Sequence, residues 1–319
     1  MSIGIGAIHC LLPQDRVSVT DLPEFAGQQD VEPGSADISG VRTVSVSTDD
    51  SACDLAVRAC RELLAAHPGE PDLMIQIASR PAEALPGSDA HRIHNRVGLT
   101  SAFPFTVGGL GCAGASVAAA LARDLLLADP ARHSVLLAYG SRPADGDRVR
   151  YPVAVVGDGA FAMTIARGGR PVLKAHRMQA DGIFNDLYRV DHKRAPGQEW
   201  SEENALKGGY FELATQSRTR MSALVDETLS DAGLTKDDIA ATLMPNVTAS
   251  AYQFYEQALG LPIHPVCGKH LAEVGHLGPI DVILNLHRLP AEGDLSSADH
   301  VLVLSNARYA TWAVTLWEV

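Results

Sequence analysis

The stretch Phe103–Ala128 constrains the fold of this chain more than any other feature. Its short apolar run, Phe105–Val107, passes through glycines that permit tight backbone turns and then enters an alanine-rich segment with strong helix propensity. This order predicts a strand, a sharp turn and a helix over Ala113–Ala128, which ends before Pro130. Because that helix has very few polar residues, we expect it to be buried at the centre of a domain.

Cys112 lies at the turn between that strand and that helix. The unpaired amide groups and the positive dipole end of a new helix would stabilise a thiolate there. Such a position suits a nucleophile. A cysteine in an apolar segment is also commonly a small buried hydrophobic residue, and the local pattern alone leaves both interpretations open.

Composition limits the class of protein. The chain has 319 residues, of which 46% are hydrophobic, so it can form one large or two medium domains with a buried core. The N-terminus lacks the basic start and the long apolar stretch of a signal peptide, which predicts a cytoplasmic protein. The formal net charge of −12 argues against nucleic acid or an anionic membrane as a partner.

The five cysteines and twelve histidines show no metal-binding pattern. The cysteines are odd in number and form no Cys-x-x-Cys pair, which argues against a disulfide framework and against a structural zinc site. His91 and His94 could share one helical face, but we interpret them as a surface pair. We therefore expect no metal.

Strands and helices alternate along the first half of the chain. This alternation predicts a layered α/β domain with a mainly parallel sheet. We expect one helix that Asp49 or Ser51 caps and that runs to Leu64, and a second helix that ends at Val97. Pro13–Gly40 has no sustained period and is predicted to be irregular or mobile. The predicted strands are Ile3–Ile8, Leu73–Ala78, His133–Tyr139, Val153–Val156 and Phe161–Ala166.

The second half roughly repeats this order of elements, which is compatible with a duplication. We place the boundary at Gly168-Gly169-Arg170-Pro171. The polar segment Gln179–Trp200 is long enough to be a lid or a partner-facing insertion. The predicted helices are Gly209–Ala232, Ser250–Leu259 and Pro279–His287, and the predicted strands are Val172–Ala175, Ala240–Met244 and a final pair, Val301–Ser305 and Ala310–Leu316.

Several short motifs, each weak alone, occur in an order and at a spacing that resemble the thiolase superfamily, specifically β-ketoacyl carrier-protein synthase III. The resemblance covers nearly the whole chain. It implies a thiolase-like five-layered αβαβα fold made of two duplicated halves, 1–169 with Cys112 and 170–319 with Asn246 and His276, and usually a homodimer. The motifs are Gly111-Cys112-Ala113-Gly114, Gly157-Asp158-Gly159-Ala160, Met244-Pro245-Asn246, Gly275-His276 and Thr311-Trp312.

The resemblance also implies an acyl group carried on Cys112, with an acyl-coenzyme A or acyl carrier-protein thioester as substrate and no tightly bound cofactor. In the family a histidine and an asparagine of the second half support the reaction. Here the two residue types have exchanged places, because Asn246 stands at the histidine position and His276 at the asparagine position. We predict that His276 performs the acid/base work while Asn246 orients a carbonyl.

Other interpretations of these histidines stay open. His276 could begin a helix and bond only to the backbone, and His270 is the reserve candidate for the acid/base residue.

Arg148 and Arg150 could contact a phosphate, although Asp145–Arg150 is more typical of a solvated charge cluster.

The surroundings of the cysteine depart from the family as well. The final hairpin has Asn306–Ala310 where the family has a glycine-rich turn that helps to form an oxyanion hole, and losing one donor there costs on the order of 10²-fold to 10³-fold in rate. Ser250–Leu259 has no Lys or Arg to steer an acidic carrier protein. Gly27–Val41 lacks the Trp and Arg that the family uses against coenzyme A.

These departures favour an acyltransferase of secondary metabolism. It would pass an acyl group from a thioester through Cys112 to an oxygen, nitrogen or carbon nucleophile of a small-molecule or carrier-bound acceptor, with His276 as acid and base. Three alternatives stay open: condensation with a malonyl thioester, thioester hydrolysis, and a catalytically weak subunit that partners an active paralogue.

Overall fold

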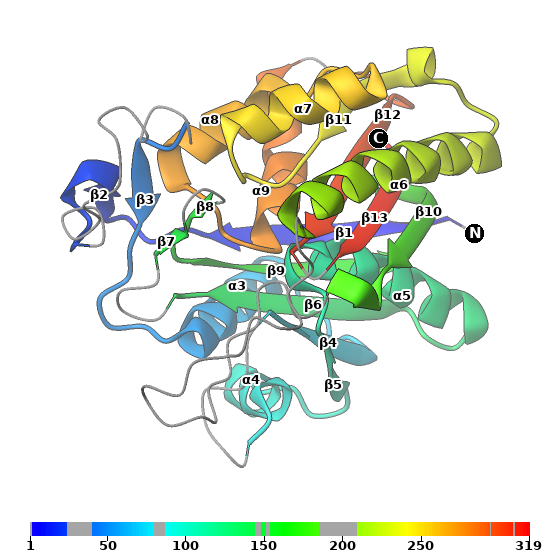
Figure 1. The fold of residues 1–319 in the computed structure, drawn as a ribbon. Coiled ribbons are helices and arrows are strands. Elements are labelled where there is room, and N and C mark those ends of the chain that lie inside the picture. The colour runs from blue at the N-terminus through cyan, green and yellow to red at the C-terminus, as the bar shows by residue number, and fades with distance from the viewer. Residues whose placement is uncertain are drawn as a thin grey trace.

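The structure is a computed structural model that describes residues 2–23, 40–79, 87–143, 148–150, 154–184, 209–293, 295–308 and 310–319. Its main element is a nine-stranded sheet in the order β11-β12-β13-β10-β1-β9-β6-β4-β5 (Figure 1). These strands are β1 (Ile3–Leu11), β4 (Leu73–Ala78), β5 (Phe103–Gly108), β6 (Ser134–Ser141), β9 (Gly159–Arg167), β10 (Val172–Ala180), β11 (Ile239–Leu243), β12 (His300–Ala307) and β13 (Thr311–Glu318). The short strands β2 (Arg16–Ser18), β3 (Thr43–Ser45), β7 (Val149–Arg150) and β8 (Ala154–Val155) form two small ribbons.

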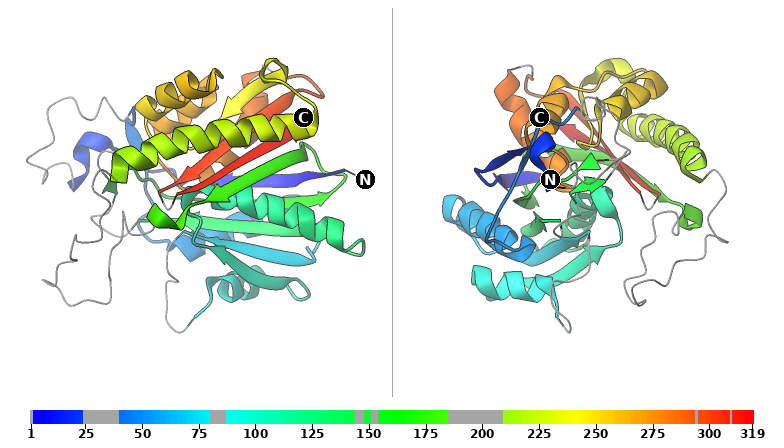
Figure 2. Two further views of the ribbon diagram at one scale, coloured as in Figure 1. Left: turned by 45° about the vertical axis from the view of Figure 1, so that its right-hand side comes forward. Right: turned by 60° about the vertical axis from the view of Figure 1, so that its left-hand side comes forward.

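Helices and the two halves of the sheet alternate in five layers (Figure 2). One outer layer contains α3 and α4, which pack against the sheet half made of β1, β9, β6, β4 and β5, and the other outer layer contains α6 and α7. Between the halves lie α5 and α9, which contact strands of both. The helices are α3 (Ala52–Ala66), α4 (Asp89–Val97), α5 (Gly114–Ala128), α6 (Gly209–Ala232), α7 (Ala249–Leu259), α8 (Pro265–Val274) and α9 (Ile280–Arg288).

The prediction of a mainly parallel sheet is wrong. Only the pairs β4–β5, β4–β6 and β11–β12 are parallel, and helices lie between their strands in the sequence. The other five pairs are antiparallel: β1–β9, β1–β10, β6–β9, β10–β13 and the hairpin β12–β13. Short connections favour antiparallel pairing, whereas a parallel pair needs a long crossover.

The prediction of a buried central helix is confirmed for α5. Its buried face is built of small side chains, with Ala115, Ala118, Ala119 and Ala122 at most 1% exposed, so both sheet halves approach the helix closely. By length and composition Gly111–Ala128 could cross a membrane, but 56% of that window is buried inside the molecule, as in the core helix of a soluble protein.

Local signals explain where α3 begins. Ser51, rather than Asp49, is its N-cap: Ser51 Oγ accepts from Asp54 N, and Asp54 Oδ2 accepts from Ser51 N, each at 3.1 Å. These bonds satisfy two amide groups that the first turn leaves unpaired.

Within Pro13–Gly40 the structure describes β2 and a 3-10 turn, Val19–Asp21, and most of the rest lies outside the described residues. Most of Gln179–Trp200 lies outside them as well.

Candidate active site

Cys112 lies in a tight 3-10 turn, Gly111–Ala113, that leads from β5 into α5. Gly111 has a φ of 50°, a conformation that favours glycine, so the chain can reverse sharply before the helix. The side chain is half-buried, and the turn packs against β12 and β13 of the opposite sheet half. The nucleophile candidate therefore lies at the start of the central helix, where the two halves meet.

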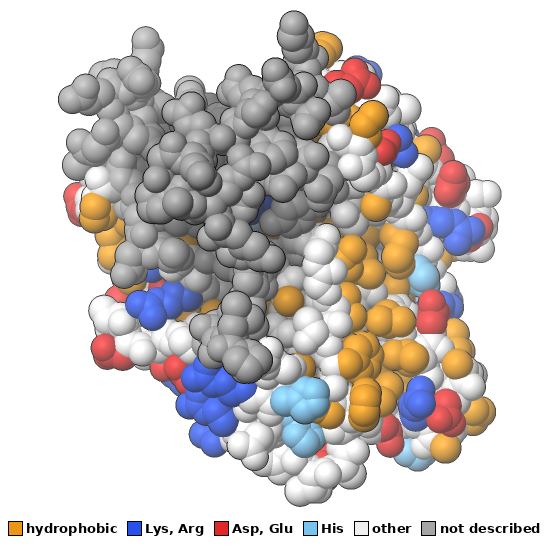
Figure 3. Space-filling view, turned by 60° about the horizontal axis from the view of Figure 1, so that its bottom comes forward, with side chains coloured by type: hydrophobic (Ala, Val, Ile, Leu, Met, Phe, Trp, Pro, Cys, Tyr) orange, Lys and Arg blue, Asp and Glu red, His pale blue; other side chains and the backbone are white. Residues whose placement is uncertain are grey.

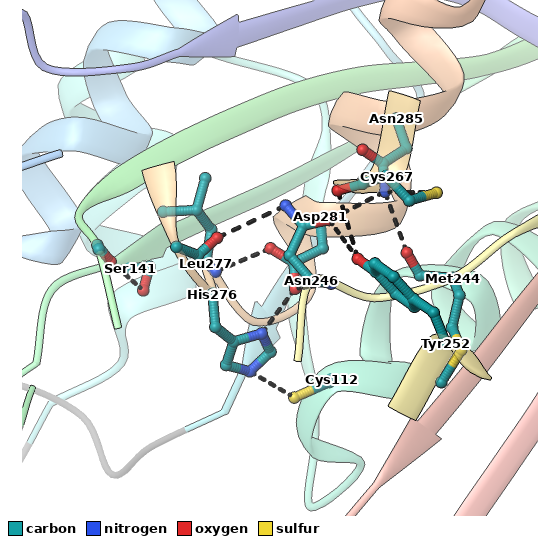
Figure 4. A network of polar contacts seen from close by, with 12 residues as sticks. Cys112, Ser141, Met244, Asn246, Tyr252, Cys267, His276, Leu277, Asp281 and Asn285 are labelled. Atoms are coloured by element: carbon teal, nitrogen blue, oxygen red, sulfur yellow. Dashed lines mark hydrogen bonds and ion pairs between the residues drawn. The ribbon is translucent and has the colours of Figure 1, made fainter. Parts of the chain in front are cut away.

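His276 lies next to this cysteine (Figure 4). Its Nε2 is 3.1 Å from Cys112 Sγ, although the two residues are 164 positions apart in the sequence. The interpretation that His276 begins a helix is wrong, because α8 ends at Val274 and α9 begins at Ile280. The predicted pair of thiol and imidazole is therefore brought within contact distance.

Asp281 completes a chain of three polar side chains. Its Oδ2 accepts from His276 Nδ1 at 2.6 Å and from Asn246 N at 2.9 Å, while Oδ1 accepts from Leu277 N at 2.7 Å. The carboxylate is fully buried in the first turn of α9, where the positive end of the helix dipole adds to these donors. Sequence analysis missed this residue, although an acid in the first turn of a predicted helix, five positions after a candidate histidine, is a detectable signal.

The surroundings of His276 favour its protonated form. Burial alone would lower the pKa of His276, but the charges of Cys112 and Asp281 and its hydrogen bonds to both outweigh burial and raise this pKa well above 6.5. Because Asp281 accepts the Nδ1 proton, the ring directs Nε2 toward the sulfur. Cys112, His276 and Asp281 thus have the connectivity of a nucleophile, a base and an orienting carboxylate.

The backbone of His276 is held by the other half of the chain. His276 N donates to Val155 O at 2.8 Å, and Gly157 N donates to His276 O at 3.0 Å. This approach needs glycine at two positions: a Cβ on Gly157 would lie 2.3 Å from Val274 O, and one on Gly275 would lie 2.6 Å from Val155 O. The motifs Gly157-Asp158 and Gly275-His276 therefore meet in space.

Arg148 supports the same segment. Its guanidinium donates to Asp158 Oδ1 and Oδ2 at 2.9 and 3.0 Å, and the Asp158 side chain is fully buried. Asp158 Oδ2 also accepts from Ser47 N at 2.8 Å. For Arg148, the interpretation as part of a solvated cluster is wrong, and its contacts also differ from those of a phosphate ligand. Asp145 lies outside the described residues.

The Asn246 amide bonds to groups other than Cys112. Its Nδ2 donates to Gly275 O at 3.5 Å, and its Oδ1 accepts from Asn285 Nδ2 at 3.1 Å and from Tyr252 OH at 3.4 Å. The residue is fully buried, and only its backbone N reaches the triad, through Asp281. The structure brings Cys112 and His276 together, whereas the Asn246 side chain bonds to Gly275, Asn285 and Tyr252.

Sequence analysis also singled out His270 and the final hairpin. His270 is buried on α8, and its Nδ1 is 2.7 Å from Asn285 Oδ1. Burial lowers the pKa of His270, so the ring is neutral at neutral pH. In the hairpin Arg308 is exposed and Ala310 has a φ of 52°.

Within the part of the chain that the structure describes, no cluster of His, Cys, Asp and Glu could hold a metal ion.

Comparisons with known proteins agree with this architecture. The profile of the family described as 3-oxoacyl-[acyl-carrier-protein] synthase III C terminal matches residues 229–319. The β-ketoacyl-[acyl-carrier-protein] synthase III of Sphingopyxis alaskensis is 25% identical over 318 residues, which cover 97% of this chain and 96% of that protein.

Solved structures share the fold over the whole chain. The 3-oxoacyl-(acyl carrier protein) synthase III of Pseudomonas aeruginosa PAO1 superposes with a TM-score of 0.79 at 21% identity, covering 100% of this chain and 98% of that one. The structure of ChlB3, described as an acyltransferase, superposes with a TM-score of 0.82 at 23% identity and the same coverage.

Proposed function

This chain is a β-ketoacyl carrier-protein synthase III-like protein of the thiolase superfamily, and from that membership we propose that it is an acyltransferase that works through an acyl-enzyme on Cys112. The acyl group comes from a coenzyme A or carrier-protein thioester and passes to an oxygen, nitrogen or carbon nucleophile. The observation that carries this proposal is the hydrogen-bonded chain from Cys112 Sγ through His276 to Asp281.

In the first half-reaction, Cys112 Sγ attacks the thioester carbonyl carbon and forms a new C–S bond. When the tetrahedral intermediate collapses, the bond to the departing thiol breaks, and the sulfur leaves with the Nε2 proton of His276. The raised pKa of His276 suits this step, because the ring holds a proton to donate. Asp281 keeps Nε2 directed at the reacting atoms.

In the second half-reaction, His276 acts as the base. Its neutral Nε2 takes the proton of the acceptor O–H, N–H or acidic C–H as that atom attacks the acyl carbon. The C–S bond to Cys112 then breaks, and the product is an ester, an amide or a ketone. One imidazole serves both half-reactions, and an Asn at this position could serve in neither.

The position of Asn246 favours transfer over decarboxylating condensation. Condensation with a malonyl thioester, as the family resemblance implies it, uses two side-chain groups next to the cysteine. Here the Asn246 amide bonds to Gly275, Asn285 and Tyr252 instead. Among the described residues, only His276 makes a side-chain hydrogen bond to Cys112. The acyltransferase description of ChlB3 supports the same choice.

We also propose a cytoplasmic homodimer that acts in secondary metabolism. β5 is the last strand of the sheet, and Phe103 on it is 66% exposed. Hydrophobic side chains gather on one face of the molecule (Figure 3). An edge strand can pair with its own copy across a two-fold axis, which would cover this edge. A Phe103→Asp variant tests the dimer, and light scattering should show it as a monomer.

Mass spectrometry of the intact protein tests the transferase. After incubation with a panel of acyl-coenzyme A and N-acetylcysteamine thioesters, wild type should gain one acyl mass, and Cys112→Ala should gain none. Cys10→Ala is the matched control, because Cys10 is another half-buried free cysteine and should leave acylation intact. Carbon dioxide release from a malonyl thioester would point to condensation instead. If no thioester of the panel and no carrier-bound thioester added to it gives an adduct, the result would favour a non-catalytic subunit.

A further inference from the structure

We infer that His270 is a positioning residue, which acts through Asn285 and Asn246 to hold Asp281, and with it His276, in place against Cys112. The inference deepens the proposed function and rests on it for the role of the triad. The connecting contacts are short and continuous: His270 Nδ1 to Asn285 Oδ1 at 2.7 Å, Asn285 Nδ2 to Asn246 Oδ1 at 3.1 Å, and Asn246 N to Asp281 Oδ2 at 2.9 Å. Figure 4 shows the part of this chain from Asn285 to Cys112.

The orientation of the Asn285 amide is determined by its neighbours. Its Nδ2 faces three acceptors, which are Met244 O at 3.0 Å, Asn246 Oδ1 at 3.1 Å and Cys267 Sγ at 3.3 Å. Turning the amide by 180° would set its oxygen against the first two of these acceptors. Its Oδ1 must therefore face His270, and His270 must donate from Nδ1.

Asn246 links this amide to the triad. Its side chain bonds to Asn285, while its backbone N donates to Asp281. Asn285 and Asp281 are four residues apart on α9 and so lie on one face of that helix. The two hydrogen bonds of Asn246 and the turn of α9 between Asp281 and Asn285 thus form a closed ring of fully buried groups. His270 on α8 donates to Asn285 in this ring.

Removing the His270 donor would disturb this ring in a defined order. Asn285 Oδ1 would be left buried without a partner, which favours rotation of the amide. Rotation would direct the Asn285 oxygen at Asn246 Oδ1 and loosen the residue whose backbone holds Asp281. A displacement of His276 on the scale of 1 Å costs about 10²-fold in reactivity, and partial loosening costs less.

The alkylation rate of Cys112 by iodoacetamide, measured from pH 5 to 10 and read at the Cys112 peptide by mass spectrometry, tests the inference. We expect His270→Leu to slow alkylation at pH 7 by about ten-fold to 10²-fold and to move the half-maximal rate to higher pH. His270→Asn, which keeps an N–H donor in the place of Nδ1, should retain the rate and profile of wild type. The charged residues around His270 are Lys269, Glu273, Arg288 and Glu292, and all are kept.

A destabilised but unrelated variant separates positioning from folding. Leu271→Ala removes a buried side chain next to His270 on α8 and should leave the alkylation profile unchanged. A folded His270→Leu variant that alkylates like wild type would overturn the inference, as would a His270→Asn variant as slow as His270→Leu. Alkylation needs no acyl donor, so the dependence on His270 can hold even where no acyl-enzyme forms, and it can fail where one does.

Discussion

His276 Nδ1 lies 2.6 Å from Asp281 Oδ2, and this bond decides which nitrogen of the imidazole faces the sulfur. The carboxylate also accepts from the backbone N–H groups of Leu277, in the loop that contains His276, and of Asn246, in the segment between β11 and α7, so both segments and the start of α9 set its position. The proposed acid/base residue and the carboxylate that orients it are therefore fixed together.

We expect Asp281→Asn to slow the acylation of Cys112 by roughly 10²-fold or more. In either orientation the new amide directs N–H at a group that itself donates, because the buried oxygens of Asp281 accept from Leu277 N, Asn246 N and His276 Nδ1. Rapid-quench mass spectrometry measures the rate. The matched control is Asp226→Asn, which removes an exposed carboxylate on α6 and should change nothing. Equal rates in both variants would remove Asp281 from the mechanism.

His276→Asn restores the residue type that the family has at this position, and we expect it to abolish transfer. The raised pKa of His276 keeps the ring positively charged beside Cys112 well above pH 6.5 in wild type. Without that charge, the half-maximal alkylation rate of Cys112 should move to higher pH. The raised pKa of His276 also stabilises the folded protein. This contribution is present in full below about pH 6.5 and is lost as the pH rises through the pKa of His276 in the folded state. An alkylation profile identical to that of wild type would show that the charge of His276 does not act on Cys112.

Gly275→Ala should displace His276 and lower both stability and acylation. Gly275 has a φ of 70° and a ψ of −156°, a region open almost only to glycine, and strain of this kind costs about 1–3 kcal/mol. The added Cβ would also lie 2.6 Å from Val155 O. Gly98→Ala isolates the backbone effect, because Gly98 has a φ of 88° with nothing within 4 Å of a new Cβ. Urea unfolding should show a loss for both variants, whereas only Gly275→Ala should slow acylation.

Arg148→Met should destabilise the fold by about 3–5 kcal/mol, because it leaves the buried Asp158 carboxylate without its cation. Urea unfolding measures this change. The exposed pair of Arg123 with Asp124 provides the comparison, and Arg123→Met should cost less than about 1 kcal/mol. A raised KM for coenzyme A thioesters with unchanged stability would instead restore Arg148 as a phosphate contact.

The helix cap of α3 predicts a pH dependence far from the active site. Burial alone would raise the pKa of Asp54, but hydrogen bonds from Ser51 and the Arg96 guanidinium outweigh burial and lower it to about 2. A lowered carboxyl pKa stabilises the folded chain above about pH 4, and this contribution is lost as the pH falls through about 2. Asp54→Asn should therefore be less stable than wild type at pH 7, with a smaller difference at pH 2. A difference that does not depend on pH would contradict this account.

Elements that depend on local sequence could be predicted well. The turn at Cys112 and the helix after it follow from glycines and alanines that are adjacent in the chain, and α6 has the predicted bounds, Gly209–Ala232. No helix was predicted for α8, since Gly268 and His270 interrupt its short apolar pattern. Periodicity identifies an element without giving the direction in which its neighbours run, so the antiparallel pairs other than the final hairpin, β12–β13, were missed.

The site could be predicted only as far as residue types allowed. Cys112 and His276 were identified from motifs, and their contact joins residues that are 164 positions apart. The direction of the Asn246 amide depends on Asn285 and Tyr252, and nothing in the local sequence around Asn246 indicates this. Asp281 faces His276 because of the rotation of α9 about its own axis, which tertiary packing decides.

The alanine face of α5 limits how a protein of this design can adapt to new acyl groups. Ala115, Ala118, Ala119 and Ala122 are buried on α5, which contacts both sheet halves, and a larger side chain at any of them would overpack this interface at a cost of roughly 1–3 kcal/mol. The helix that follows the proposed nucleophile is therefore a poor place for variation. Changes in substrate size must arise in the loops at the strand ends, where insertions and substitutions leave the central helix untouched.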